Sequence, residues 1–191
     1  MMSRFLILFL FSSFSSVFSF AQEKSEREVR VKASEVPSSA KDWLKDAFEE
    51  IKRPKWYLEF SLEGKAFEAK FWREKHFHSV KFDSLGRLVD VEIEITKKEM
   101  PEESWLAIES YLESEFEEFA VQKIQRQLIG EEGDVEDYFD ENETEGVKIR
   151  YEIVFEGKKE NWQLWEALFD ESGAFLTLVR IQVKPVDNLI F

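Results

Sequence analysis

The chain contains no cysteine, which removes thiol catalysis, thiolate metal sites and thiol redox chemistry from consideration. Disulfides are also impossible, so the stability of the folded protein must come from its core. Nineteen phenylalanines and six tryptophans can supply such a core, because each aromatic side chain buries a large apolar area.

Positive charge is scarce, with 26 Lys and Arg against 40 Asp and Glu and a formal net charge of −14. A strongly negative protein is repelled by phosphate backbones and anionic lipid headgroups, which argues against nucleic acid and membrane surfaces as partners. Catalytic signatures are missing too, since no G-x-S-x-G, H-E-x-x-H, G-x-G-x-x-G or Walker A pattern occurs. The sequence therefore favours a non-catalytic protein that needs no cofactor.

No hydrophobic run is long enough to cross a bilayer, which takes roughly 20 apolar residues. The apolar run from Phe5 to Phe11 follows one basic residue, Arg4, and precedes a Ser/Phe stretch that ends at Ala21. This order is typical of a secretory signal peptide, so residues 1–21 are predicted to be removed after Ala21. The mature chain is expected in the periplasm or the medium, with no membrane insertion after cleavage.

Two segments repeat the same order of one helix followed by four strands, the first over residues 36–98 and the second over residues 99–185. A helix-plus-meander unit buries one face of its sheet under its helix. We therefore expect an α+β fold in which both units join into one curved antiparallel sheet of about eight strands, with the helices on one face. Residues 22–35 are predicted to be a loose N-terminal arm, and residues 186–191 a C-terminal tail.

The repeated motifs are the helix starts Val36-Pro37 and Met100-Pro101 and the turns Phe82-Asp83-x-x-Gly86-x-Leu88 and Phe169-Asp170-x-x-Gly173. With this order of elements, the chain resembles the PepSY-like family that has a β-lactamase-inhibitor-protein-like fold, over about residues 36–183. The resemblance implies an exported bacterial domain without established enzymatic activity. It also implies a concave sheet face of the kind that the inhibitor uses to grip a protein, although a shared fold does not transfer a function.

The sheet face without helices is the predicted binding surface. Strand phase assigns four residues to it: Trp72, His78, Arg150 and Trp165. Outward aromatic side chains on a sheet can anchor a partner. The alternative is that the arm, the insert described next or the tail covers them. The first hypothesis is thus an exported module that holds a protein or peptide on this face.

Residues 130–146 form an acidic insert in the second repeat, with nine carboxylates and no basic side chain. Clustered carboxylates suit Ca²⁺, which takes about six to eight oxygen ligands, and the candidate ligands are Asp134, Glu136, Asp140 and Glu145. An EF-hand loop beginning at Asp134 would, however, place Phe139 where glycine is needed. The alternative is a solvated, mobile, self-repelling loop. A Ca²⁺-responsive envelope protein is the second hypothesis, and a hydrolase with a carboxylate pair is the third.

Overall fold

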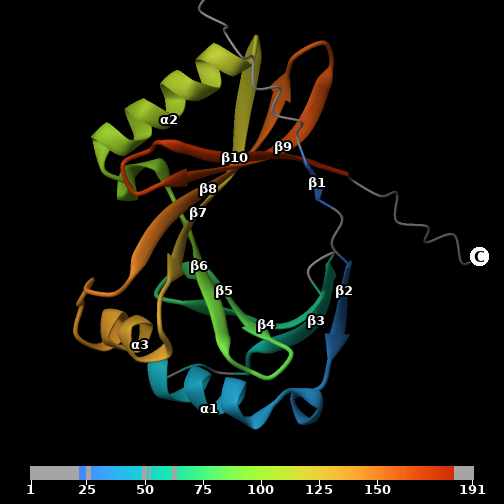
Figure 1. Ribbon diagram of the computed structural model, residues 1–191, viewed down its shortest axis with the longest axis vertical. Coiled ribbons are helices and arrows are strands. Elements are labelled where there is room, and N and C mark those ends of the chain that lie inside the picture. The colour runs from blue at the N-terminus through green and yellow to red at the C-terminus, as the bar shows by residue number, and fades with distance from the viewer. Residues whose placement is uncertain (1–21, 25–26, 49–50, 52, 62–63, 183–191) are drawn as a thin grey trace, which may run out of the picture.

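The computed structural model describes residues 22–24, 27–48, 51, 53–61 and 64–182. The predicted signal peptide and C-terminal tail lie outside these residues. Ten strands form one sheet in the order β1-β10-β9-β8-β7-β6-β5-β4-β3-β2, and the sheet curls around an open centre (Figure 1). The strands are β1 Gln22–Lys24, β2 Arg27–Val31, β3 Lys55–Ser61, β4 Gly64–Arg73, β5 His76–Asp83, β6 Leu88–Ile95, β7 Glu118–Ile129, β8 Lys148–Lys158, β9 Trp162–Asp170 and β10 Phe175–Ile181.

Three helices cover the outer, convex face of this sheet: α1 Ser38–Ala47, α2 Glu102–Glu115 and α3 Glu132–Asp140. Trp43 of α1 and Trp105 and Ile108 of α2 are buried against the strands and form part of a continuous apolar core. This is the expected α+β fold, a curved sheet with its helices on one face. β1 and β2 extend the sheet beyond the expected eight or so strands, and it is antiparallel except where β1 pairs with β10. Among the described residues, none of the helices has the length and apolar character needed to cross a bilayer.

The two repeats tie their helices to the sheet in the same way. A 3-10 turn precedes each helix, η1 Ala33–Glu35 before α1 and η2 Lys97–Glu99 before α2. The hydroxyl of Ser39 donates a hydrogen bond to the carbonyl oxygen of Leu85 (3.2 Å), and the hydroxyl of Ser104 donates one to that of Glu171 (2.7 Å). These serines therefore fasten each helix start to a hairpin turn. They do not cap the helices, because both N-cap positions are proline.

Residues 22–35 are not the loose arm that the sequence led us to expect, because they supply β1, β2 and η1. β1 pairs in parallel with β10 at one edge of the sheet, and β2 pairs antiparallel with β3 at the other. Only residues 25 and 26 separate these strands, and three peptide units span at most roughly 11 Å. The two edges of the sheet must therefore nearly meet, as the adjacent β1 and β2 in Figure 1 show.

The acidic insert is not the mobile loop that was the main alternative to a Ca²⁺ site, because much of it forms α3. Val135 is fully buried, and the ring centroids of Phe139 and Phe48 lie 4.4 Å apart. The indole Nε1 of Trp43 donates a hydrogen bond to the carbonyl oxygen of Glu132 (3.0 Å). Apolar residues four positions apart share one helix face, so the sequence did contain a signal for this helix among its acids.

We expect Gly133→Ala to raise the free energy of unfolding by about 0.5 kcal/mol, because alanine favours a helix over glycine. A methyl group added at Gly133 would contact nothing within 4 Å, so helix propensity alone should decide the sign. Urea titration followed by circular dichroism measures the change. A loss of stability would contradict a helical insert.

Candidate functional site

The concave face of the sheet carries no helix and encloses a cavity of about 340 Å³. Its lining comes from every strand from β2 to β10. Seven of the lining residues are acidic and three are lysines: Glu28, Glu59, Glu68, Glu92, Glu94, Glu152 and Glu166, with Lys70, Lys81 and Lys123. The cavity therefore carries an excess of negative charge when these groups are ionised.

Strand alternation places these polar side chains, because successive residues of a strand point to opposite faces of a sheet. In β6, Val91 and Ile93 face the helices and are buried in the core, whereas Asp90 and Glu92 face the inside of the curled sheet. The alternation of β6 is visible in the sequence and is typical of a half-buried strand. The curl of the sheet instead leaves Asp90 only 9% exposed.

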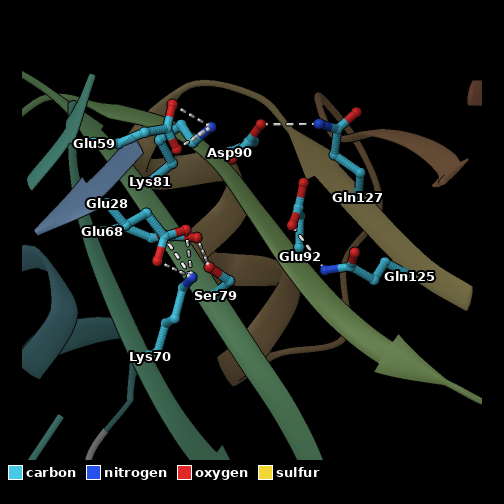
Figure 2. A network of polar contacts seen from close by, with 10 residues as sticks. All are labelled: Glu28, Glu59, Glu68, Lys70, Ser79, Lys81, Asp90, Glu92, Gln125 and Gln127. Carbon is cyan, nitrogen blue, oxygen red and sulfur yellow. Dashed lines mark hydrogen bonds and ion pairs between the residues drawn. The ribbon is translucent and has the colours of Figure 1, made fainter. Parts of the chain in front are cut away.

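On the β2–β5 side of the cavity, carboxylates are neutralised by lysine ammonium groups (Figure 2). Lys70 Nζ lies 2.7 Å from Glu28 Oε1 and 3.0 Å from Glu68 Oε2. Lys81 Nζ lies 3.0 Å from Glu59 Oε2. Burial raises the pKa of Glu28 despite its bond to Lys70. Burial alone would lower the pKa of Lys70, but the bonds to Glu28 and Glu68 outweigh it and raise that pKa.

One trio of potential metal ligands occurs here. Glu28, Glu59 and Glu68 bring carboxylate oxygens within 4.8 Å of one another, and no second trio exists in the part of the chain that the structure describes. The ammonium groups of Lys70 and Lys81 already lie between these carboxylates. These two cations offset two of the three negative charges of the trio.

On the β6–β7 side, two carboxylates bond to amides, and Lys123 is the one lysine of these two strands that lines the cavity. Gln125 Nε2 donates a hydrogen bond to Glu92 Oε2 (2.8 Å), and Gln127 Nε2 donates one to Asp90 Oδ2 (2.9 Å), as Figure 2 shows. Burial raises the pKa of Asp90 to about 6. Burial, together with the carboxylates of Glu152 and Asp90, raises the pKa of Glu92 well above its usual range. Negative charge on this side is thus poorly compensated.

We expect Lys70→Met to lower the free energy of unfolding by about 2 kcal/mol at pH 7. Removing one member of a buried ion pair costs about 3–5 kcal/mol, and solvent reduces this because the Lys70 side chain is 21% exposed. The loss should shrink near pH 5, because Glu28 has a raised pKa and its protonation removes repulsion from Glu68. Guanidinium titration at both pH values measures the change.

Lys55→Met provides the matched control for Lys70→Met, because Lys55 is an exposed lysine at the start of β3. It should change stability by less than about 0.5 kcal/mol. Equal losses in the two variants, or a larger Lys70→Met loss at pH 5 than at pH 7, would contradict the lysine's role as an internal counterion.

Two of the four predicted contact residues share the phase of the cavity-lining residues. Trp72 lies two positions after Lys70 on β4 and therefore points to the same face, and its side chain is 69% exposed. The centroid of its ring lies 5.5 Å from that of Phe77, which lines the cavity. Trp72 therefore stands at the mouth. Arg150 is half-buried and shares the phase of Glu152 on β8, but it is not among the residues that line the cavity.

The other two contact residues were assigned to the wrong face. His78 is buried in the core, stacked on Phe71 with ring centroids 5.3 Å apart, and burial lowers its pKa to about 4. Trp165 packs on Phe116, and its Nε1 donates a hydrogen bond to the carbonyl oxygen of Gly157 (3.2 Å). Residues two and four positions apart on a strand point to the same face. The residues at these positions after His78 and Trp165 are fully buried: Val80 and Phe82 in β5, and Ala167 and Phe169 in β9.

The predicted Ca²⁺ ligands do not assemble into a site. Asp134, Glu136 and Asp140 lie on α3, and Glu145 lies in the segment after it. No three of them bring ligand oxygens within 4.8 Å of one another. A helix turns about 100° per residue, so Asp134 and Glu136 point to nearly opposite sides of its axis. Partial burial and the nearby carboxylates of Asp46, Asp140 and Asp137 raise the pKa of Glu136.

Sequence reasoning missed the residues that build the cavity. Those of the polar network in Figure 2 are Glu28, Glu59, Glu68, Lys70, Ser79, Lys81, Glu92 and Gln125. The hydrogen-bonded pair Asp90 and Gln127 extends this network beside the cavity lining. The available signal was polar alternation in several strands, above all in β6. That pattern is equally typical of a strand with one face in water.

No protein-family model matches the sequence, and no curated protein does either. Solved structures do match. A DUF2874 family protein from Bacteroides uniformis aligns with a TM-score of 0.52 and 15% identity over 76% of this chain and 89% of that one. A predicted periplasmic protein from Bacteroides eggerthii aligns with a TM-score of 0.51 and 17% identity over 76% and 88%. A BLIP-like protein from Bacteroides fragilis aligns at 0.49, with 15% identity over 82% and 92%.

At such low identities the similarity concerns the fold alone. A relation to PepSY domains, part of the resemblance drawn from the sequence, is not shown by these structures. The chain shares the fold of the DUF2874 family proteins and of the predicted periplasmic protein from Bacteroides eggerthii.

Proposed function

We propose that the protein is an exported, non-catalytic binding module that holds a peptide segment of a partner protein in the concave face of its sheet. The carrying observation is the cavity itself, which is enclosed by nine strands and left uncovered by all three helices. Ligand sites range over about 300–1,000 Å³. A volume of about 340 Å³ suits one or two side chains of a short segment better than a folded domain.

Export is supported by the predicted signal peptide and by the fold shared with a predicted periplasmic protein. The first strand of the sheet begins at Gln22, directly after the predicted cleavage point at Ala21. A chain cut there would keep all ten strands, including the two that bring the sheet edges together.

A binding role is favoured over catalysis by the places of the two histidines, which are frequent acid–base catalysts. His78 is buried in the core, and His76 is paired with Glu99, its Nε2 lying 2.6 Å from Glu99 Oε1. Both therefore lie outside the cavity lining.

Photo-crosslinking tests the proposal. A benzoylphenylalanine at position 77 would replace a half-buried aromatic ring inside the cavity, and one at position 113 would replace an exposed glutamate on the outer face of α2. In the envelope fraction of the producing cells, position 77 should form a discrete adduct and position 113 should not. Trp72→Ala should weaken the adduct, because it removes the exposed ring at the mouth.

The proposal fails if position 113 forms the same adduct as position 77, or if only position 113 crosslinks. Either result would move binding to the outer face. Mass spectrometry of the adduct identifies the partner segment.

A further inference from the structure

We infer that the segment held in the cavity presents a lysine side chain, whose ammonium group binds beside Glu92 between β6 and β7. This inference deepens the proposed function and rests on it. It commits to one ligand chemistry, an alkylammonium group on a peptide.

Some carboxylates of the cavity already bind lysine ammonium groups of the protein itself. On the β2–β5 side, the ammonium groups of Lys70 and Lys81 lie 2.7–3.2 Å from carboxylate oxygens. On the β6–β7 side, the partner of Glu92 is the amide of Gln125 (Figure 2). A ligand lysine would repeat there the arrangement that the chain's own lysines make across the cavity.

Charge favours a cation over any other ligand. The lining holds seven carboxylates against three lysines. Lys81 and Lys123 offset only part of the repulsion that Glu152 and Asp90 exert on Glu92. An ammonium group beside Glu92 would supply the missing countercharge in a site where poor solvation strengthens the attraction.

A second observation, independent of the acids, points to a hydrogen-bond donor. Gln125 is 5% exposed and lines the cavity, and its Oε1 has no donor among the described residues. Its Nε2 is committed to Glu92, which fixes the orientation of the amide. Since buried acceptors are nearly always paired, a donor is missing next to the Glu92 carboxylate.

The rest of the lining suits the aliphatic stem of a lysine. Phe77, Val154 and Ile181 supply apolar surface inside the cavity. Trp72 stands at the mouth with its ring exposed, and tryptophan is the strongest aromatic partner for a cation that passes over its face. A lysine could thus lay its apolar stem along these side chains while its charged tip reaches the carboxylates inside the cavity.

The test is an NMR titration of the ¹⁵N-labelled mature protein, followed at the Gln125 side-chain amide. The probes are three blocked peptides that differ at one central position, Gly-Gly-Lys-Gly-Gly, Gly-Gly-Nle-Gly-Gly and Gly-Gly-Glu-Gly-Gly. We expect the lysine peptide to shift the Gln125 amide and to bind at least about tenfold more tightly than the norleucine and glutamate peptides. Its affinity should fall as the pH is lowered, because the raised pKa of Glu92 lets this carboxylate become protonated above its ordinary range.

Glu92→Gln is the decisive variant, because it removes the charge and keeps the size and an acceptor for Gln125. It should weaken the lysine peptide at least about tenfold. Glu113→Gln makes the same change of charge on the outer face of α2 and should leave the affinity unchanged. Melting curves of both variants confirm that they fold.

The two proposals fail separately. If the norleucine peptide binds as tightly as the lysine peptide, or if Glu92→Gln has no effect, the lysine assignment is overturned while the cavity still binds peptide. If the lysine peptide leaves the Gln125 amide unmoved, the assignment is also overturned, and the crosslinking experiment alone decides the proposed function.

Discussion

Gly173→Ala should lower the free energy of unfolding by about 3 kcal/mol and the melting temperature by roughly 6–12 °C. Gly173 has φ +86, a backbone conformation that L side chains rarely adopt. An added Cβ would also lie 2.3 Å from the carbonyl oxygen of Ser104, which belongs to the first turn of α2. Either the turn or the helix must therefore move. Thermal unfolding followed by circular dichroism measures the change.

Gly64→Ala is the control for this prediction, because Gly64 also has a positive φ (+133) but a Cβ there would meet nothing within 4 Å. It should cost about 1–2 kcal/mol, from backbone strain alone. The difference between the two variants gives the contribution of the close contact between turn and helix. Equal losses would mean that α2 does not rest on the turn in solution.

His78 and Asp90 are buried on opposite faces of the sheet, and the stability that each contributes should change with pH in opposite directions. Burial lowers the pKa of His78 from 6.5 to about 4, so its neutral form stabilises the fold above pH 6.5. About 3 kcal/mol of that stability should be lost as pH falls from 6.5 toward 4. Burial raises the pKa of Asp90 from 3.8 to about 6. Its contribution has the opposite sign, with about 3 kcal/mol gained as pH falls from 6 to 3.8.

Two variants separate these contributions. His78→Phe keeps an aromatic ring against Phe71 and Phe48 and removes the titrating group, so its stability relative to wild type should rise on acidification. Asp90→Asn keeps the size and removes the acid, so its relative stability should fall. Urea titrations between pH 7 and pH 4 should show the two curves diverging from wild type in opposite directions. Parallel curves would contradict the burial of both groups.

Local patterns were sufficient to predict the hairpin turns and the α+β class. Turn motifs such as Asp83–Gly86 and Asp170–Gly173 need only a few neighbouring residues to form, since one Asp side chain accepts bonds from the backbone of its own turn. Strand phase likewise predicted that Trp72 lies on the face without helices. The assignment was wrong for His78 and Trp165. Each lies an even number of positions before buried residues of its own strand and therefore points to the same face as they do.

The helix in the acidic insert depended on contacts that no local pattern specified. Its two apolar residues, Val135 and Phe139, are few among the acids, and a strongly charged segment alone favours a solvated loop. Packing against Phe48 and Trp43 of the first repeat supplies the apolar surface that stabilises it. These residues lie about ninety positions earlier in the chain.

The sequence by itself determined the α+β class and the polar alternation of the strands, because each depends on periodicity or on turns a few residues long. Only the tertiary structure decided what the polar face becomes. The short, charged strand Arg27–Val31 pairs with β3 at one edge of the sheet. β1 pairs at the opposite edge with β10, which lies at the far end of the described chain. With its two edges close together, the sheet curls so that its face without helices lines a cavity, where burial makes the carboxylates require partners.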